Sequence, residues 1–148
     1  MKTLSFIRHG KSSWADVSLS DIDRPLNNRG LTDCCLMAEQ IGKAGYELQT
    51  LFCSPANRAL STAKLLLDSL ANPDIQCVVD ESLYTFSFAE LRHWVEQIPE
   101  VHEDVVVIGH NPAITEFCNY IANAHIVNVP TCGYVRLKSE AANWNKLG

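Results

Sequence analysis

Short apolar runs alternate along this chain with segments in which apolar residues recur at helical spacing. The clearest strand signal is Val105-Val106-Val107-Ile108, which has no polar residue between its members. A strand of that composition is typically buried on both faces, as in the middle of a parallel sheet. Together with four other short runs, this pattern predicts strands over residues 3–8, 51–53, 75–79, 104–108 and 134–137.

Helical periodicity first occurs after Asn27, a residue type that caps helix N-termini. We expect this helix to end at Gly42 and Gly45. A second helix is expected to open at Ser54-Pro55, where a capping residue precedes the proline favoured at the first helical position, and to end at Asn72-Pro73. The residues expected to face the core are Leu31, Cys34, Cys35, Ala38 and Ile41 in the first helix and Ala59, Ala63, Leu66, Leu67 and Leu70 in the second.

Two further helices complete the alternation. One covers residues 88–98 and stops at Pro99, and the other opens at Asn111-Pro112. The inward residues of this last helix are expected to be Ile114, Phe117, Cys118 and Ile121. Because parallel strands need crossover connections that cover both faces of their sheet, we expect an α/β fold, a three-layer α/β/α sandwich around a mainly parallel sheet. The 148 residues carry no repeat or linker, which indicates a single domain over residues 1–148.

The charge balance narrows the possible partners. The chain has 12 Lys and Arg against 17 Asp and Glu, a net charge of −5, so we expect no basic face for nucleic acid. No apolar run approaches the roughly 20 residues that a membrane span requires, and Met1-Lys2 leads into a strand rather than a signal peptide. We therefore expect a cytoplasmic protein that binds neither nucleic acid nor membrane.

Six cysteines are present, without a C-x-x-C motif or the Cys/His spacing of a zinc site. Free cysteine behaves as a small apolar residue, so we expect buried, reduced thiols. The sequence predicts neither a structural metal nor a disulfide framework.

Three predicted strands end in residues that carry chemistry. Arg8-His9-Gly10 follows the first strand, Arg58 lies four residues after Ser54 at the end of the second, and His110 follows the apolar strand 104–108. Ligands of open α/β sheets bind beyond the carboxyl ends of the strands, so these residues should converge. Imidazole and guanidinium groups, with the N-terminus of the helix at Asn111-Pro112, suit a phosphoryl group.

Each of these residues also has a structural interpretation. A single histidine at a strand end is more often a solvated or capped residue than a catalyst. Arg24 and Arg29 could simply pair with Asp21 or Asp23 in the loop 11–25 that is expected to run over the strand end. No role is assigned to the three other histidines, His93, His102 and His125.

Taken in order, the motifs resemble the histidine phosphatase superfamily, whose fold is that of phosphoglycerate mutase. They are Phe6-Ile7-Arg8-His9-Gly10, Arg24-Pro25-Leu26, Ser54-Pro55 with Arg58-Ala59 and Thr62-Ala63, and Val107-Ile108-Gly109-His110-Asn111-Pro112. The short chain, the R-P-L segment and the late Pro130-Thr131-Cys132-Gly133 are similar to the SixA branch of phosphohistidine phosphatases. The resemblance covers essentially the whole chain.

This resemblance implies a metal-independent phosphatase without a cofactor. His9 would be the nucleophile, and Arg8, Arg58 and His110 would hold the phosphoryl oxygens. We expect His9 to be neutral and His110 to be protonated, because one must attack and the other must donate. The expected substrate is phosphohistidine on a signalling or phosphocarrier protein; alternatives are a phosphatase of small phosphorylated metabolites and a phosphate-binding or scaffold domain without catalysis.

The general acid is missing from this assignment. Larger members of the superfamily place a carboxylate after the third strand, where Glu81 and Glu90 are the nearby candidates. Both more often belong to solvated surfaces, since glutamate is rarely buried without a partner. Imidazole is a better leaving group than an alkoxide and needs less help from an acid, so the weak acid signal favours a P–N bond in the substrate.

Overall fold

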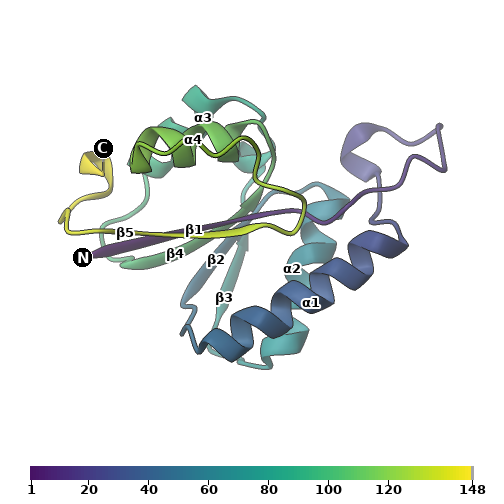
Figure 1. Cartoon of the computed structure of the whole chain (residues 1–148), viewed down its shortest axis with the longest axis horizontal. Coiled ribbons are helices and arrows are strands. Elements are labelled where there is room, and N and C mark those ends of the chain that lie inside the picture. The colour runs from purple at the N-terminus through teal and green to yellow at the C-terminus, as the bar shows by residue number, and fades with distance from the viewer. Residues whose placement is uncertain (148) are drawn as a thin grey trace.

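The structure, a computed structural model, describes residues 1–147 and contains one five-stranded sheet (Figure 1). Its strands lie in the order β3-β2-β4-β1-β5. β5 runs antiparallel to β1, and the other neighbours are parallel. The strands are β1 (Lys2–Arg8), β2 (Thr50–Cys53), β3 (Gln76–Val79), β4 (Asp104–Gly109) and β5 (Tyr134–Ser139).

Helices cover both faces of the sheet. α1 (Asn28–Ala44) and α2 (Asn57–Leu70) pack on one face, and α3 (Phe88–Glu96) and α4 (Ala113–Ala122) pack on the other (Figure 1). Three short 3-10 turns span Asp21–Asp23, Glu81–Leu83 and Trp144–Lys146. The three-layer α/β/α sandwich with a mainly parallel sheet is therefore confirmed.

The sheet separates two hydrophobic cores, and β4 contributes to both. Val105 and Val107 pack towards α3 and α4, whereas Val106 and Ile108 pack towards α1 and α2. All four side chains are fully buried, as the unbroken apolar run predicts. Burial on both faces holds β4 in place in the sheet. The position of β4 in turn determines where His110, the next residue, lies.

The predicted core face of α1 was partly wrong. Cys34, Ala38 and Ile41 are buried, but Leu31 is 44% exposed and Cys35 is exposed, while Met37 takes a core position. At about 100° per residue, Cys35 and Leu31 lie on one flank of the buried stripe, and Met37 lies on the other flank next to the sheet.

The cysteines also depart from the expectation in part. Cys35 and Cys77 are exposed, so the prediction of six buried thiols was wrong for these two. All six are free, and the thiols of Cys34 and Cys132 form a hydrogen bond, with an Sγ–Sγ distance of 3.2 Å, and no disulfide. Among residues 1–147, no group of three or more His, Cys, Asp or Glu side chains is arranged to hold a metal ion. No helix in this part of the chain is long and apolar enough to cross a membrane.

Candidate active site

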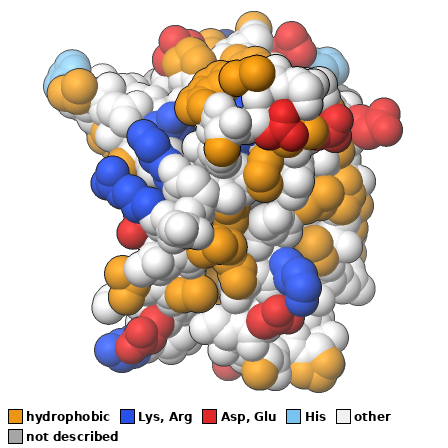
Figure 2. Space-filling model, turned by 90° about the vertical axis from the view of Figure 1, so that its right-hand side faces the viewer, with side chains coloured by type: hydrophobic (Ala, Val, Ile, Leu, Met, Phe, Trp, Pro, Cys, Tyr) orange, Lys and Arg blue, Asp and Glu red, His pale blue; other side chains and the backbone are white. Residues whose placement is uncertain are grey.

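The carboxyl ends of three adjacent strands meet at one edge of the sheet. His9 follows β1, Ser54 follows β2, and His110 follows β4. Backbone bonds continue the strand pairing past these ends: His9 N donates to Gly109 O at 3.2 Å, and Ser54 N donates to Ile108 O at 3.1 Å. Figure 2 faces this edge, where Lys and Arg side chains gather beside exposed apolar side chains.

Two imidazoles and one guanidinium lie together at this edge. The ring centroids of His9 and His110 are 5.1 Å apart, and these residues are 8% and 1% exposed. Arg58, in the first turn of α2, is 3% exposed and directs its Nε towards His9 Nε2 at 3.4 Å. Helical side chains lean towards the N-terminus of their helix, which brings this guanidinium back over the strand ends.

Arg8, the fourth predicted residue, reaches the site from the last residue of β1. Its Nη1 donates to Val129 O at 3.0 Å, and its buried Nε has no hydrogen-bond partner among the described residues. Its positive charge helps to lower the pKa of both His9 and His110. An unpaired guanidinium N–H at this place is free to donate to an anionic ligand.

His9 is held as a neutral base. Its Nδ1 lies 2.7 Å from Gly10 O, and because a carbonyl oxygen only accepts, Nδ1 carries the proton and Nε2 keeps its lone pair. Burial, with further contributions from Arg58, Arg8 and Arg24, lowers the pKa of His9 to about 4. At neutral pH Nε2 is therefore unprotonated, and its lone pair accepts a hydrogen bond from Arg58 Nε.

His110 differs from the expectation. Burial, followed by repulsion from His9 and Arg58, lowers its pKa to about 3, so the prediction of a protonated His110 beside a neutral His9 was wrong for the free protein. Its Nε2 lies 2.8 Å from Ser54 Oγ. Ser54 Oγ also accepts from Ala56 N, and its own hydroxyl proton can be donated to His110 Nε2 in the tautomer that carries the ring proton on Nδ1. A neutral His110 can donate from that buried atom, which has no protein partner among the described residues.

Ser54 does not have the role that its position in the sequence suggested. α2 begins at Asn57 after Ala56, so the expected cap and first-turn proline at Ser54-Pro55 were wrong. The Ser54 hydroxyl bonds to His110 instead, and the chain turns between Ser54 and the first residue of α2. In the sequence, Ser54-Pro55 stands close to Arg58 in one motif. Nothing in that motif indicates that Ser54 bonds to His110.

Thr62, one turn after Arg58 on α2, fixes the turn at Gly10. Its Oγ1 accepts from Gly10 N at 3.0 Å and donates to Arg58 O at 2.7 Å. Spacing of four residues places Thr62 and Arg58 on the same face of the helix. The backbone after His9 is thus attached to the same helix that supplies the guanidinium.

The remaining candidates have structural partners. Arg24 is buried and donates to Ser12 Oγ, Ser13 O and Asp21 Oδ1, so it ties the loop 11–25 together. Arg29 is exposed and pairs with Asp33. Glu81 is exposed, and Glu90 accepts from Thr85 Oγ1 at 3.3 Å; neither forms a hydrogen bond or ion pair with the histidines or Arg58.

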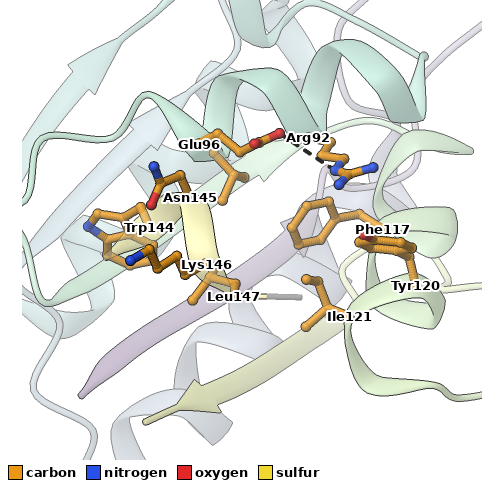
Figure 3. A pocket seen from close by; sticks show the side chains of 10 residues that line it. Arg92, Glu96, Phe117, Tyr120, Ile121, Trp144, Asn145, Lys146 and Leu147 are labelled. Atoms are coloured by element: carbon orange, nitrogen blue, oxygen red, sulfur yellow. Dashed lines mark ion pairs between the residues drawn. The ribbon is translucent and has the colours of Figure 1, made fainter. Parts of the chain in front are cut away.

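A separate pocket lies on the α3 and α4 side of the sheet (Figure 3). Trp144 and Phe117 line it, and Arg92 pairs with Glu96 at its rim. Its lining contains no histidine or cysteine. The chemistry of this molecule is therefore concentrated at the strand ends and not in this pocket.

Comparison with known proteins identifies relatives over most of the chain. The family model described as "Histidine phosphatase superfamily (branch 1)" matches residues 4–100. An uncharacterized protein of Picosynechococcus sp. is 32% identical over 146 residues, covering 94% of this chain and 86% of that protein. A 2,3-bisphosphoglycerate-dependent phosphoglycerate mutase of Bartonella bacilliformis is 29% identical over 92 residues, which cover 61% of this chain but only 45% of the mutase.

The fold is shared with a solved structure of the protein histidine phosphatase SixA complexed with tungstate. The TM-score is 0.80 at 22% sequence identity, and the match covers 95% of this chain and 91% of that one.

Proposed function

This chain belongs to the histidine phosphatase superfamily, and we propose that it hydrolyses phosphohistidine on a protein through a phosphohistidine intermediate at His9. The observation that carries the proposal is the state of His9: a neutral ring whose Nδ1–H is bound to Gly10 O and whose unprotonated Nε2 accepts a hydrogen bond from Arg58 Nε at 3.4 Å. A phosphoryl group attacked at Nε2 would have cationic donors immediately around it.

The proposed reaction has two steps. His9 Nε2 attacks phosphorus, a P–N bond to His9 forms, and the P–N bond of the substrate breaks to release its imidazole. Water then attacks the same phosphorus, and the bond to His9 Nε2 breaks to release inorganic phosphate. Arg58, Arg8 and the Nδ1–H of His110 would stabilise the charge on the phosphoryl oxygens in both steps, a role for which this site needs no metal ion.

The absence of an acid at the site favours an imidazole leaving group. Neither Glu81 nor Glu90 bonds to His9, Arg58 or His110, and hydrogen bonds from Tyr84 and Arg58 outweigh the effect of burial to lower the pKa of Asp21 to about 2. A carboxyl group of that pKa is a poor proton donor at neutral pH. Imidazole leaves with less assistance than an alkoxide, and the fold likeness to SixA supports the same choice.

A second candidate is a phosphatase of small phosphorylated metabolites, which the match to phosphoglycerate mutases supports. The chain spans less than half of those mutases, so their substrates do not transfer to it directly. Assays of a phosphohistidine protein against 3-phosphoglycerate and phosphosugars separate the two. A higher kcat/KM for a small ester would replace the first proposal by the second.

The covalent step is tested by trapping. We expect label from a ³²P-phosphohistidine protein to appear on His9 after a quench in alkali, in which phosphohistidine survives. His9→Ala should abolish both label and turnover, whereas His93→Ala, which changes an exposed histidine of α3, should retain both. Equal turnover by His9→Ala and wild type would exclude the covalent mechanism, and no turnover by wild type on any donor would favour a phosphate-binding domain.

A further inference from the structure

The carboxylate of Asp21 binds the guanidinium of Arg58, which faces His9. Arg58 Nη2 donates to Asp21 Oδ2 at 3.0 Å, and Arg58 Nη1 donates to the backbone carbonyl of Asp21 at 2.7 Å. The Arg58 side chain is only 4% exposed, so this residue has few alternative partners in water. Asp21 lies in the 3-10 turn Asp21–Asp23 of the loop 11–25, and no sequence pattern predicts its contact with α2.

Because the guanidinium of Arg58 is planar, its two bonds to Asp21 fix the orientation of the whole group. The group is planar and presents its N–H bonds along fixed edges. Asp21 takes the edge formed by Nη1 and Nη2, which leaves the edge formed by Nε and the second proton of Nη2. That free edge contains the Nε that lies 3.4 Å from His9 Nε2. Because the plane is rigid, a bond to one edge sets the direction of the other.

Asp21 is itself held from two other directions. Tyr84 donates its hydroxyl proton to Asp21 Oδ2, and Arg24 Nη1 donates to Oδ1 at 3.2 Å. Tyr84 also packs edge-on against the ring of His110, with centroids 5.5 Å apart. The carboxylate is thereby connected to His9 through Arg58 and to His110 through Tyr84.

We propose that Asp21 is a positioning residue for the reaction at His9: it holds Arg58 by the far edge of the guanidinium so that the Nε edge faces the phosphoryl group. This inference rests on the proposed function. Asp21 does not donate the proton to the leaving group, and it acts on the reaction only through Arg58. Without that carboxylate, Arg58 keeps its charge and the bond from Nη1 to the backbone carbonyl of residue 21, but loses the second bond, from Nη2, that fixes its plane.

The test compares Asp21→Asn with Asp23→Asn. Both remove one carboxylate from the same short turn, but the Asp23 carboxylate accepts from Ser20 Oγ and forms no hydrogen bond or ion pair with Arg58. We expect Asp21→Asn to lower kcat by about tenfold or more with little change in KM, since misplaced catalytic groups cost rate. Asp23→Asn should stay within about twofold of wild type. Equal kcat values for the two variants would overturn the proposal.

Two further readouts separate positioning from acid catalysis and from a structural role. The loss in Asp21→Asn should be the same factor for a phosphoimidazole and for an alkyl phosphate, because a positioning residue acts on both; a loss confined to the alkyl ester would make Asp21 the acid. In an Arg58→Lys background, Asp21→Asn should cost little more, because its target is gone. Independent losses in that cycle would contradict the inference.

The orientation can also be observed without any turnover. The Nε–H proton of Arg58, assigned by its disappearance in Arg58→Lys, should give a distinct NMR signal in wild type and Asp23→Asn and a broadened one in Asp21→Asn. An unchanged signal would overturn the positioning role even if the proposed function fails. Should Asp21→Asn not fold, Tyr84→Phe removes only the hydroxyl that holds Asp21 and should lower kcat in the same direction, and an unchanged kcat in Tyr84→Phe would then count against the role.

Discussion

His9 and His110 are titratable residues held in their neutral form by the protein around them. Burial is the largest cause in both cases, and it lowers the pKa from the ordinary value of 6.5 to about 4 for His9 and about 3 for His110. The unfolded chain retains the ordinary value. Between these values the unfolded chain binds protons that the folded chain does not, so acid acts directly on stability.

We expect the free energy of unfolding to fall as the pH is lowered from about 7 to about 5. The folded pKa values lie below the unfolded ones, so the two imidazoles favour the folded state fully above about 6.5 and progressively less below it. Each imidazole contributes a slope of at most about 1.4 kcal/mol per pH unit. Urea unfolding at several pH values measures it, and His9→Gln and His110→Gln should each flatten the slope. Identical slopes in wild type and both variants would contradict the assignment.

The hydroxyl of Ser54 is expected to contribute to both stability and activity. Ser54→Ala removes the hydroxyl from His110 Nε2 and from Ala56 N, both inside a fully buried segment. We expect a loss of about 1–3 kcal/mol in the free energy of unfolding, because buried polar atoms lose their partners. Activity should also fall, by about tenfold, since His110 is no longer fixed. Ser61→Ala on the outer part of α2, whose hydroxyl bonds only to Asn57, should show neither effect.

Among the elements, α1 shows how closely a helix approaches the loop that follows His9. A Cβ placed on Gly30 would lie 2.2 Å from Lys11 O, the carbonyl that also accepts from Asn27 N. A Cβ on Gly42, near the other end of the same helix, meets nothing closer than Leu70 Cδ2 at 3.7 Å. The beginning of α1 therefore needs glycine for space, and its end does not.

Alanine substitutions at these two glycines should have opposite effects. Gly42→Ala should raise the free energy of unfolding by up to about 1 kcal/mol, because glycine is a poor helix former. Gly30→Ala should lower it and reduce activity, since the backbone at Lys11 must move and Gly10 and His9 move with it. Thermal unfolding and kcat measured on the pair decide this. A stabilised, fully active Gly30→Ala would show that the loop 11–25 accommodates a side chain there.

The sequence predicts these elements well where burial is continuous and poorly where a distant partner intervenes. The apolar run of β4 identified a central strand because no polar residue interrupts it. Ser54 was interpreted as a helix cap from its neighbours in the sequence. Its partner, His110, lies 56 residues further along the chain, where no local pattern can indicate it. Asp21 stood in a loop without periodicity, and its partners Arg58 and Tyr84 lie 37 and 63 residues away, so no local pattern contains them.

For the molecule as a whole, the parallel sheet explains why part of the site could be foreseen. Carboxyl ends of parallel strands share one edge, so His9, Arg58 and His110 were expected together from the order of their elements alone. The neutral state of His9 was expected from the proposed attack, but that of His110 was not, because it depends on how deeply the finished fold buries the ring. The sequence thus located both histidines but not the charge of His110.

The position of β1 in the sheet also determines when the site can exist at all. Its two neighbours are β4 and β5, so Thr3 pairs with Asp104 on one side and Lys138 on the other. During synthesis β1 is made before either of its neighbours, because β4 begins only at Asp104 and β5 at Tyr134. A chain ending at residue 103 would contain His9 and Arg58 and still lack both neighbours of β1. We expect such a chain to show no cooperative unfolding transition by circular dichroism, so that His9, the proposed nucleophile, is synthesised well before it can reach its place.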